Sequence, residues 1–319
     1  MFTKRMLCLI FLMFFYLPIA LYADENINDR LLSELIYPVD TATANVRKLL
    51  KEGADPNAAD SLGCSALMWA VNNDVVGSVR LLLEAGADVN GREKSGRTAL
   101  MYAMQRVIFT GQDRGYRVVK MLLDKGADGR VRDKEGWDAL MCLAFFGNGI
   151  AANNRGSAFD SNGRGTPKEL NKDTVAALLN CKPYINAVNS DGETALILAA
   201  GRGEAYLVKE LLARSANVNT ADKAGYTALM AASMHGAADV AAMLADNGAT
   251  INQLNNYGET ALMFAAGQGH IQVVKELLAR NADVNITSKY GHSATVLARL
   301  GEHKEIIRLL QAAQSNAGK

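Results

Sequence analysis

Apolar residues in the second half of the chain recur in two alternating patterns. Thr227 is followed by the apolar run 228–232, after which Val240, Met243 and Leu244 are spaced by three and one residues. These spacings predict two short helices, the first capped by the Thr227 hydroxyl and the second with a single apolar face. Neither helix buries its apolar side alone, so the pattern predicts that each helix pair stacks on a neighbouring pair.

The same pattern returns at a fixed interval. A glycine stands two residues before each Thr-Ala-Leu or its variant, and four of the six intervals between these glycines are 33 residues, while the other two are 40 and 56. A period of this length predicts an all-α repeat solenoid of helix-turn-helix units. The marker glycines are Gly63, Gly96, Gly136, Gly192, Gly225, Gly258 and Gly291.

The clearest copy of the repeat is the stretch 257–285, which contains Gly-x-Thr-Ala-Leu-Met-x-Ala-Ala and then Val-x-x-Leu-Leu. Together with the Gly-Ala-Asp-Val-Asn that closes other copies, it resembles the ankyrin repeat family over nearly all of residues 27–312. The family's usual Thr-Pro-Leu-His is Thr-Ala-Leu-Met here, a mild departure because alanine is a good helix former. The resemblance implies an ankyrin helix-turn-helix stack with β-hairpin-like connecting loops, which binds proteins and has no catalytic chemistry.

One domain is expected over residues 24–312, with about eight units and degenerate caps at both ends. The first unit, 24–57, lacks Thr-Ala-Leu, and we expect its helices at 27–36 and 44–51. In the last unit Ser293-Ala294-Thr295-Val296 replaces Thr-Ala-Leu-Met. Residues 313–319 are expected to form a frayed tail.

The N-terminal segment has the pattern of a secretory signal peptide. Lys4 and Arg5 precede the apolar run 6–21, and Ala23 precedes an acidic, polar sequence. We therefore expect a signal peptide over residues 1–23 and an exported, periplasmic protein of a bacterium. A secreted protein and an uncleaved membrane anchor are the alternatives, although the run is shorter than the roughly 20 residues of a spanning helix and Pro18 interrupts it.

Composition changes this interpretation little. The formal net charge is +1, and without a basic patch we expect no nucleic-acid partner. Cys64, Cys142 and Cys181 lack metal-type spacing and are expected to be mostly buried thiols, although a Cys142–Cys181 pair stays open. A methionine recurs at one repeat position and is expected in the core, at Met68, Met101, Met141, Met230 and Met263.

Both long intervals come from insertions between the first and second helix of adjacent units, near 107–113 and 147–170. They therefore emerge on one edge of the stack, and insertions of this kind often lie on the binding face of a repeat protein. The larger one is rich in glycine and asparagine and carries Arg155, Phe159 and Arg164. The alternative is a surface loop without a function, because long loops destabilise a fold only slightly.

The resemblance places partner contacts around the marker glycine and at the end of the first helix. Aromatic residues and arginine at such positions often dominate interface energy, although some of them could instead pack against neighbouring turns. Carried over to this sequence, the partner-binding candidates outside the larger insertion are Arg97, Arg106, Trp137, Phe145, Phe146, Arg202, Tyr226, His235, Tyr257 and Tyr290.

The histidines His235, His270, His292 and His303 have no nucleophile or paired base at catalytic spacing. We therefore expect no enzyme activity, cofactor, metal or small-molecule substrate. The sequence predicts a non-enzymatic protein–protein interaction scaffold of the cell envelope or secreted space, with an unidentified protein partner. The alternatives are a regulatory or protective subunit of an exported enzyme or toxin, and an enzyme that uses the 147–170 insertion as an active-site loop.

Overall fold

The computed structural model describes residues 26–106, 112–146 and 171–317. Helices occur in consecutive pairs, one pair to a unit, and we number the units one to eight from the N-terminus. The first helices are α2 (Ile27–Ile36), α4 (Ala66–Asn72), α6 (Ala99–Arg106), α8 (Ala139–Phe146), α10 (Ala195–Arg202), α12 (Ala228–His235), α14 (Ala261–Gln268) and α16 (Ala294–Leu300). The second helices are α3 (Ala42–Lys51), α5 (Val76–Glu84), α7 (Gln112–Asp124), α9 (Lys172–Asn180), α11 (Ala205–Leu212), α13 (Ala238–Asp246), α15 (Ile271–Ala279) and α17 (Lys304–Ala317).

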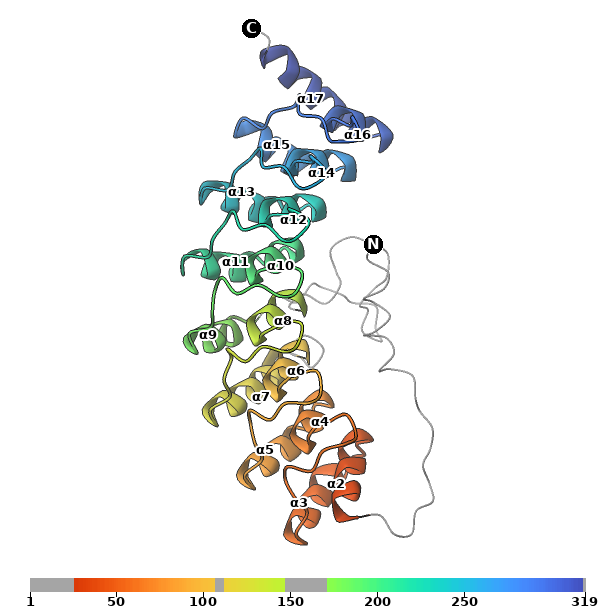
Figure 1. Cartoon of the computed structure of the whole chain (residues 1–319), viewed down its shortest axis with the longest axis vertical. Coiled ribbons are helices and arrows are strands. Elements are labelled where there is room, and N and C mark those ends of the chain that lie inside the picture. The colour runs from red at the N-terminus through yellow and green to blue at the C-terminus, as the bar shows by residue number, and fades with distance from the viewer. Residues whose placement is uncertain (1–25, 107–111, 147–170, 318–319) are drawn as a thin grey trace.

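The helices form two parallel rows. Each first helix packs on the first helices of its neighbours, and the second helices form the other row. Figure 1 shows the stack as a shallow arc, with the row of first helices on its inner side. Antiparallel bridges such as Ala221 with Thr227 close some of the connecting turns. The predicted all-α repeat solenoid with hairpin-like loops is therefore confirmed.

Local signals start and stop the first helices as predicted. The Met230 N–H donates to the Thr227 hydroxyl at 3.3 Å, which satisfies one of the free donors at the start of α12. Gly236 ends α12 in the left-handed conformation with φ 77°. A Cβ atom there would lie 2.6 Å from the ring of His270 in the next unit, so the close approach of the units also requires glycine.

The core runs without a break between the two rows. Leu229 and Leu262 are each 1% exposed, and Val240 and Leu244 of α13 are fully buried. The five methionines of the predicted column, Met68, Met101, Met141, Met230 and Met263, are all buried, so their core role is confirmed. Because each unit covers the apolar side of the next, stability depends on contacts between neighbours.

Asparagines join the units along the edge formed by the Asp-Val-Asn turns. The Asp88 N–H donates to Asn57 Oδ1 at 2.7 Å, and the Asn217 N–H donates to Asn186 Oδ1 at 2.8 Å. The predicted turn-forming asparagines therefore also link one unit to the next. In unit three this position is Arg130, which pairs with Asp128 of its own turn. The ladder of asparagines is thus interrupted between the two units that carry insertions.

Both insertions lie between the first and second helix of their units, as predicted. The smaller one was expected to span 107–113, but α7 already begins at Gln112. The inserted residues next to α7 therefore extend this helix. Residues 107–111 and 147–170 lie outside the described residues.

The terminal units differ from expectation at their ends. Helix α2 has its predicted bounds, whereas α3 starts at Ala42, two residues earlier than expected. The prediction that the tail frays from residue 313 was wrong, because α17 continues to Ala317. The sequence Gln-Ala-Ala-Gln that precedes Ser315 consists of good helix formers, and no glycine or proline interrupts it.

The described helices are those of the repeat units. In residues 26–106, 112–146 and 171–317, no helix is long and apolar enough to cross a bilayer. The expected signal peptide, 1–23, lies outside these residues.

Cys64, Cys142 and Cys181 are free thiols. Complete burial, the largest effect on Cys142, raises its pKa to about 12, so this thiol stays protonated near neutral pH.

Candidate protein-binding surface

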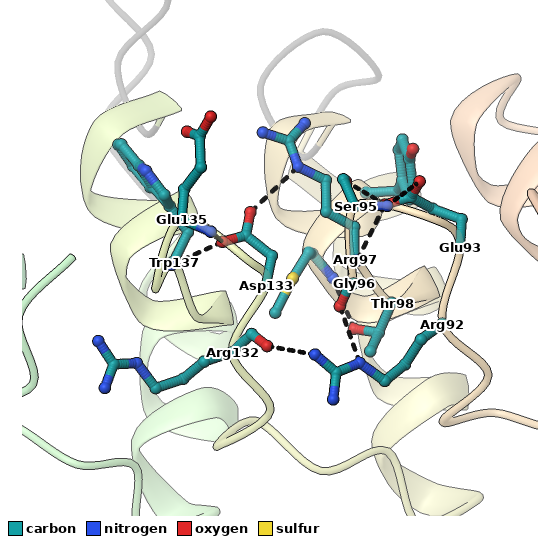
Figure 2. Close-up of polar contacts among 12 residues, drawn as sticks. Arg92, Glu93, Ser95, Gly96, Arg97, Thr98, Arg132, Asp133, Glu135 and Trp137 are labelled. Carbon is teal, nitrogen blue, oxygen red and sulfur yellow. Dashed lines mark hydrogen bonds and ion pairs between the residues drawn. The ribbon is translucent and has the colours of Figure 1, made fainter. Parts of the chain in front are cut away.

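Each hairpin turn is built around one polar side chain. In unit four, Asp133 Oδ1 accepts hydrogen bonds from the N–H groups of Glu135 and Trp137, both at 2.9 Å (Figure 2). Gly136 completes the turn with φ 80°. A similar arrangement fixes the residue after the marker glycine in the other units with hairpin turns, where the accepting side chain comes from Asp60, Glu93, Asn189, Asp222, Asn255 or Ser288.

Backbone hydrogen bonds join each turn to the next. The Lys134 N–H donates to the Ser95 carbonyl at 2.8 Å, and the Ser190 N–H donates to the Glu135 carbonyl at 2.7 Å. Because every turn is held to its neighbours, the side chains that follow the glycines form a column with a fixed register.

Two arginines reinforce the turns of the units that carry insertions. Arg92 Nε donates to the Gly96 carbonyl at 3.1 Å, and its Nη2 donates to the Arg132 carbonyl at 2.6 Å (Figure 2). Arg132 repeats this pattern toward the carbonyls of Gly136 and Val188. The equivalent positions in other units are Ala59, Val188, Ala221, Leu254 and Thr287, which have no such donor. Units three to five are therefore joined more strongly at this edge than the others.

Four of the predicted contact residues meet in units four and five. Trp137 and Phe145 contact edge to face with ring centroids 5.4 Å apart, and Phe145 and Phe146 do so at 4.9 Å. The guanidinium carbon of Arg202 lies 4.5 Å from the centroid of the Phe145 ring. All four side chains are partly exposed. We call Trp137, Phe145, Phe146 and Arg202 the aromatic–arginine cluster.

A second group of predicted contact residues lies in units six to eight. Tyr226 packs on Phe264 of the next unit with ring centroids 5.4 Å apart. Tyr257 and Tyr290 stack at 6.5 Å on successive turns and are 41% and 66% exposed. Within the described part of the chain, no ring contact joins these tyrosines to the aromatic–arginine cluster. These seven predicted contact residues thus form two patches.

The repeat signature of this architecture matches known family models. A model of ankyrin repeats (3 copies) matches residues 39–133 and 168–255, which is more than half of the chain. The chain belongs to the ankyrin repeat family. A further model of ankyrin repeats (many copies) matches residues 244–298. The search of curated proteins gives no match.

Membership of the ankyrin family indicates a protein–protein interaction module, a class that generally has no enzyme activity. Within the described ranges, no group of three or more histidine, cysteine, aspartate or glutamate residues is placed to hold a metal ion. His270 and His303 immediately precede α15 and α17. Their Nε2 atoms lie 3.0 and 3.2 Å from the carbonyl oxygens of Met234 and Gly267 in the preceding units. These two histidines therefore join neighbouring ankyrin units.

The remaining contact candidates have mixed surroundings. Arg97 Nε lies 3.3 Å from Asp133 Oδ2, so this arginine already has a carboxylate partner within the ankyrin stack. Arg106 is half-buried at the end of α6. His235 ends α12 and is an exposed residue, yet desolvation lowers its pKa, and the positive charge of Arg202 lowers it further. Arg155, Phe159 and Arg164 lie outside the described residues and stay predictions.

Three aromatic residues of the inner face were not among the contact residues predicted from the sequence. Trp69, Tyr102 and Phe264 are partly exposed and stand five positions after the residue that follows the glycine. Tyr226 contacts Phe264 in the next unit, so the two repeat positions form one surface. Aligning all ankyrin units at this position would have shown the aromatic residues.

Asp138 is an unusual cap within the ankyrin stack. Threonine caps α10, α12 and α14, whereas Asp138 accepts from the Met141 N–H at 2.8 Å at the start of α8. The side chain is 1% exposed, and desolvation raises its pKa to about 6 despite this hydrogen bond. The pKa of Asp138 is therefore higher in the folded chain than in the unfolded chain. Because of this difference, ionisation of the Asp138 carboxyl group lowers the free energy of unfolding as pH rises from about 4 to 6.

Replacing Asp138 with threonine should remove this loss. The free energy of unfolding of Asp138→Thr relative to the natural chain is expected to increase between pH 4 and pH 7, by at most about 3 kcal/mol. Urea unfolding followed by circular dichroism at both pH values measures the change. Thr227→Ser, a cap without a titratable group, serves as the control. An Asp138→Thr difference that does not vary with pH would contradict the assignment.

Proposed function

We propose that the chain is a non-enzymatic scaffold of the cell envelope or secreted space, which binds a protein partner through the inner face of units three to five. The observation that supports this most directly is the aromatic–arginine cluster. Tryptophan and arginine are enriched among the residues that dominate binding energy, and aromatic rings provide a large contact area. Here they lie together and are partly exposed, with Trp137 on a turn that is held rigidly and the other three at the ends of α8 and α10.

Two features of the surroundings favour this face. The reinforcing arginines Arg92 and Arg132 restrict movement of the turns that carry Arg97 and Trp137. A surface that is rigid before binding loses less entropy when a partner docks. The chain leaves α8, whose end carries Phe145 and Phe146, directly into the insertion 147–170. The placement in the envelope rests on the sequence pattern of residues 1–23.

Site-specific photo-crosslinking in intact cells tests the proposal. The photoreactive amino acid p-benzoylphenylalanine would replace Glu135, an exposed residue next to Trp137. Tyr184, which is 61% exposed and lies after α9, is the matched control. We expect a protein of defined mass to crosslink at position 135 in the periplasmic fraction, and not at position 184. Crosslinking at 184 alone, or at neither position, would contradict the proposed face.

A further inference from the structure

Arg202 differs from other arginines of the stack in its surroundings. Arg97, Arg214 and Arg280 each lie within ion-pair distance of a carboxylate. Arg202 is half-buried, and within the described part of the chain no carboxylate lies within that distance of its guanidinium. Its guanidinium lies over the ring of Phe145.

The environment disfavours the charge of Arg202. Desolvation lowers the pKa of the guanidinium, and the nearby carboxylate of Glu204 offsets this only in part. A partly buried cation without an ion-pair partner destabilises a protein unless another group compensates. Contact with the Phe145 ring is favourable for a cation but occupies only one face of the planar group. The N–H donors point outward in the plane of the guanidinium, where they suit the two oxygens of a carboxylate.

The neighbours of Arg202 supply mainly apolar surface, so the guanidinium provides the positive charge of this region. Phe145 continues to Trp137 and Phe146 through edge-to-face contacts. His235 of the next unit is close enough for the charge of Arg202 to lower its pKa. A ligand that complements this surface therefore carries a negative charge beside an apolar side chain.

We propose that the aromatic–arginine cluster binds an acidic segment of the protein partner, with a carboxylate on the N–H edge of Arg202 and an apolar side chain against Trp137 and Phe146. The inference deepens the proposed function and rests on it, because it names the chemistry that the same face recognises. The choice of a carboxylate follows from charge complementarity, and the choice of a neighbouring apolar side chain follows from the exposed rings.

Selection from a displayed library of short random peptides tests the inference without knowledge of the partner. The full chain would be immobilised, and the sequences retained would be compared with those retained by Arg202→Gln. Arg214→Gln is the matched control, since it removes one positive charge from the same unit on the outer row of helices. We expect peptides with aspartate or glutamate next to an apolar residue to be enriched by the natural chain and by Arg214→Gln, but not by Arg202→Gln.

The best peptide would then be synthesised with a fluorophore and titrated. Loss of a charge-assisted hydrogen bond predicts about 10- to 100-fold weaker binding to Arg202→Gln. Replacing the acidic residue of the peptide by its amide should have the same effect on the natural chain and no added effect on Arg202→Gln. Arg202→Lys, which keeps the charge but not the planar group, should bind with intermediate affinity and provides a second variant if Arg202→Gln unfolds.

Selection of no peptide, selection of peptides without acidic residues, or equal enrichment by Arg202→Gln would overturn the inference. These outcomes are separate from the proposed function. Crosslinking at position 135 with no effect of Arg202→Gln would leave the binding face in place and refute only the acidic recognition.

Discussion

Truncating Leu229 to alanine is expected to lower the free energy of unfolding by about 2–5 kcal/mol. Leu229 is 1% exposed between units, so the truncation leaves a cavity against the neighbouring helices and removes apolar contacts. Urea denaturation followed by circular dichroism measures the loss. The effect should be shared by adjacent units, because the stack is stabilised by contacts between neighbours.

Leu254→Ala is the matched control for this truncation. Leu254 lies in the turn before α14 and is 47% exposed, so the same chemical change there should alter the free energy of unfolding by less than about 1 kcal/mol. Equal losses in the two variants would contradict the assignment of Leu229 to the core and Leu254 to the surface.

Asp133→Ala is expected to destabilise the chain by about 2–4 kcal/mol and to displace Trp137. The variant leaves the N–H groups of Glu135 and Trp137 without their acceptor, and Arg97 without its carboxylate partner. A donor left without an acceptor destabilises by about 1–3 kcal/mol where water is excluded, and these two hydrogen bonds are partly buried. Denaturant unfolding measures the stability, and tryptophan fluorescence reports the surroundings of Trp137.

Replacing Asp133 with asparagine distinguishes the contribution of the turn's hydrogen bonds to stability from that of the ion pair with Arg97. Asn255 accepts from the N–H groups of Tyr257 and Glu259 at 2.9 Å in another unit, so the turn tolerates an amide. Asp133→Asn should therefore lose only the ion pair with Arg97 and destabilise by about 1 kcal/mol. A loss as large as that of Asp133→Ala would show that the turn does not depend on these two hydrogen bonds.

The repeat period predicts most of the fold because it depends on local signals. Apolar spacing, the threonine caps and the glycines after the first helices recur in register, and the structure has the corresponding helices and turns. The ends were harder to predict. The start of α7 and the extension of α17 depend on residues outside the repeat pattern, where only helix propensity was informative.

The candidate site could be predicted only in part. Alignment to the repeat identified Trp137, Phe145, Phe146 and Arg202, but not that their side chains meet, because contacts between units depend on how each unit is rotated on the next. The support that Arg92 and Arg132 give to the turns was not predicted either. Their partners are backbone carbonyls, and these leave no signal in the side-chain sequence.

Binding of the crosslinked partner to Trp137→Ala tests the central claim most directly. Isothermal titration calorimetry would compare this variant with Tyr184→Ala, which changes an exposed aromatic residue outside the proposed face. If units three to five bind the partner, Trp137→Ala should keep its fold and weaken binding by at least about tenfold, while Tyr184→Ala binds like the natural chain. Unchanged affinity of a folded Trp137→Ala, with weaker binding by Tyr184→Ala, would contradict the account.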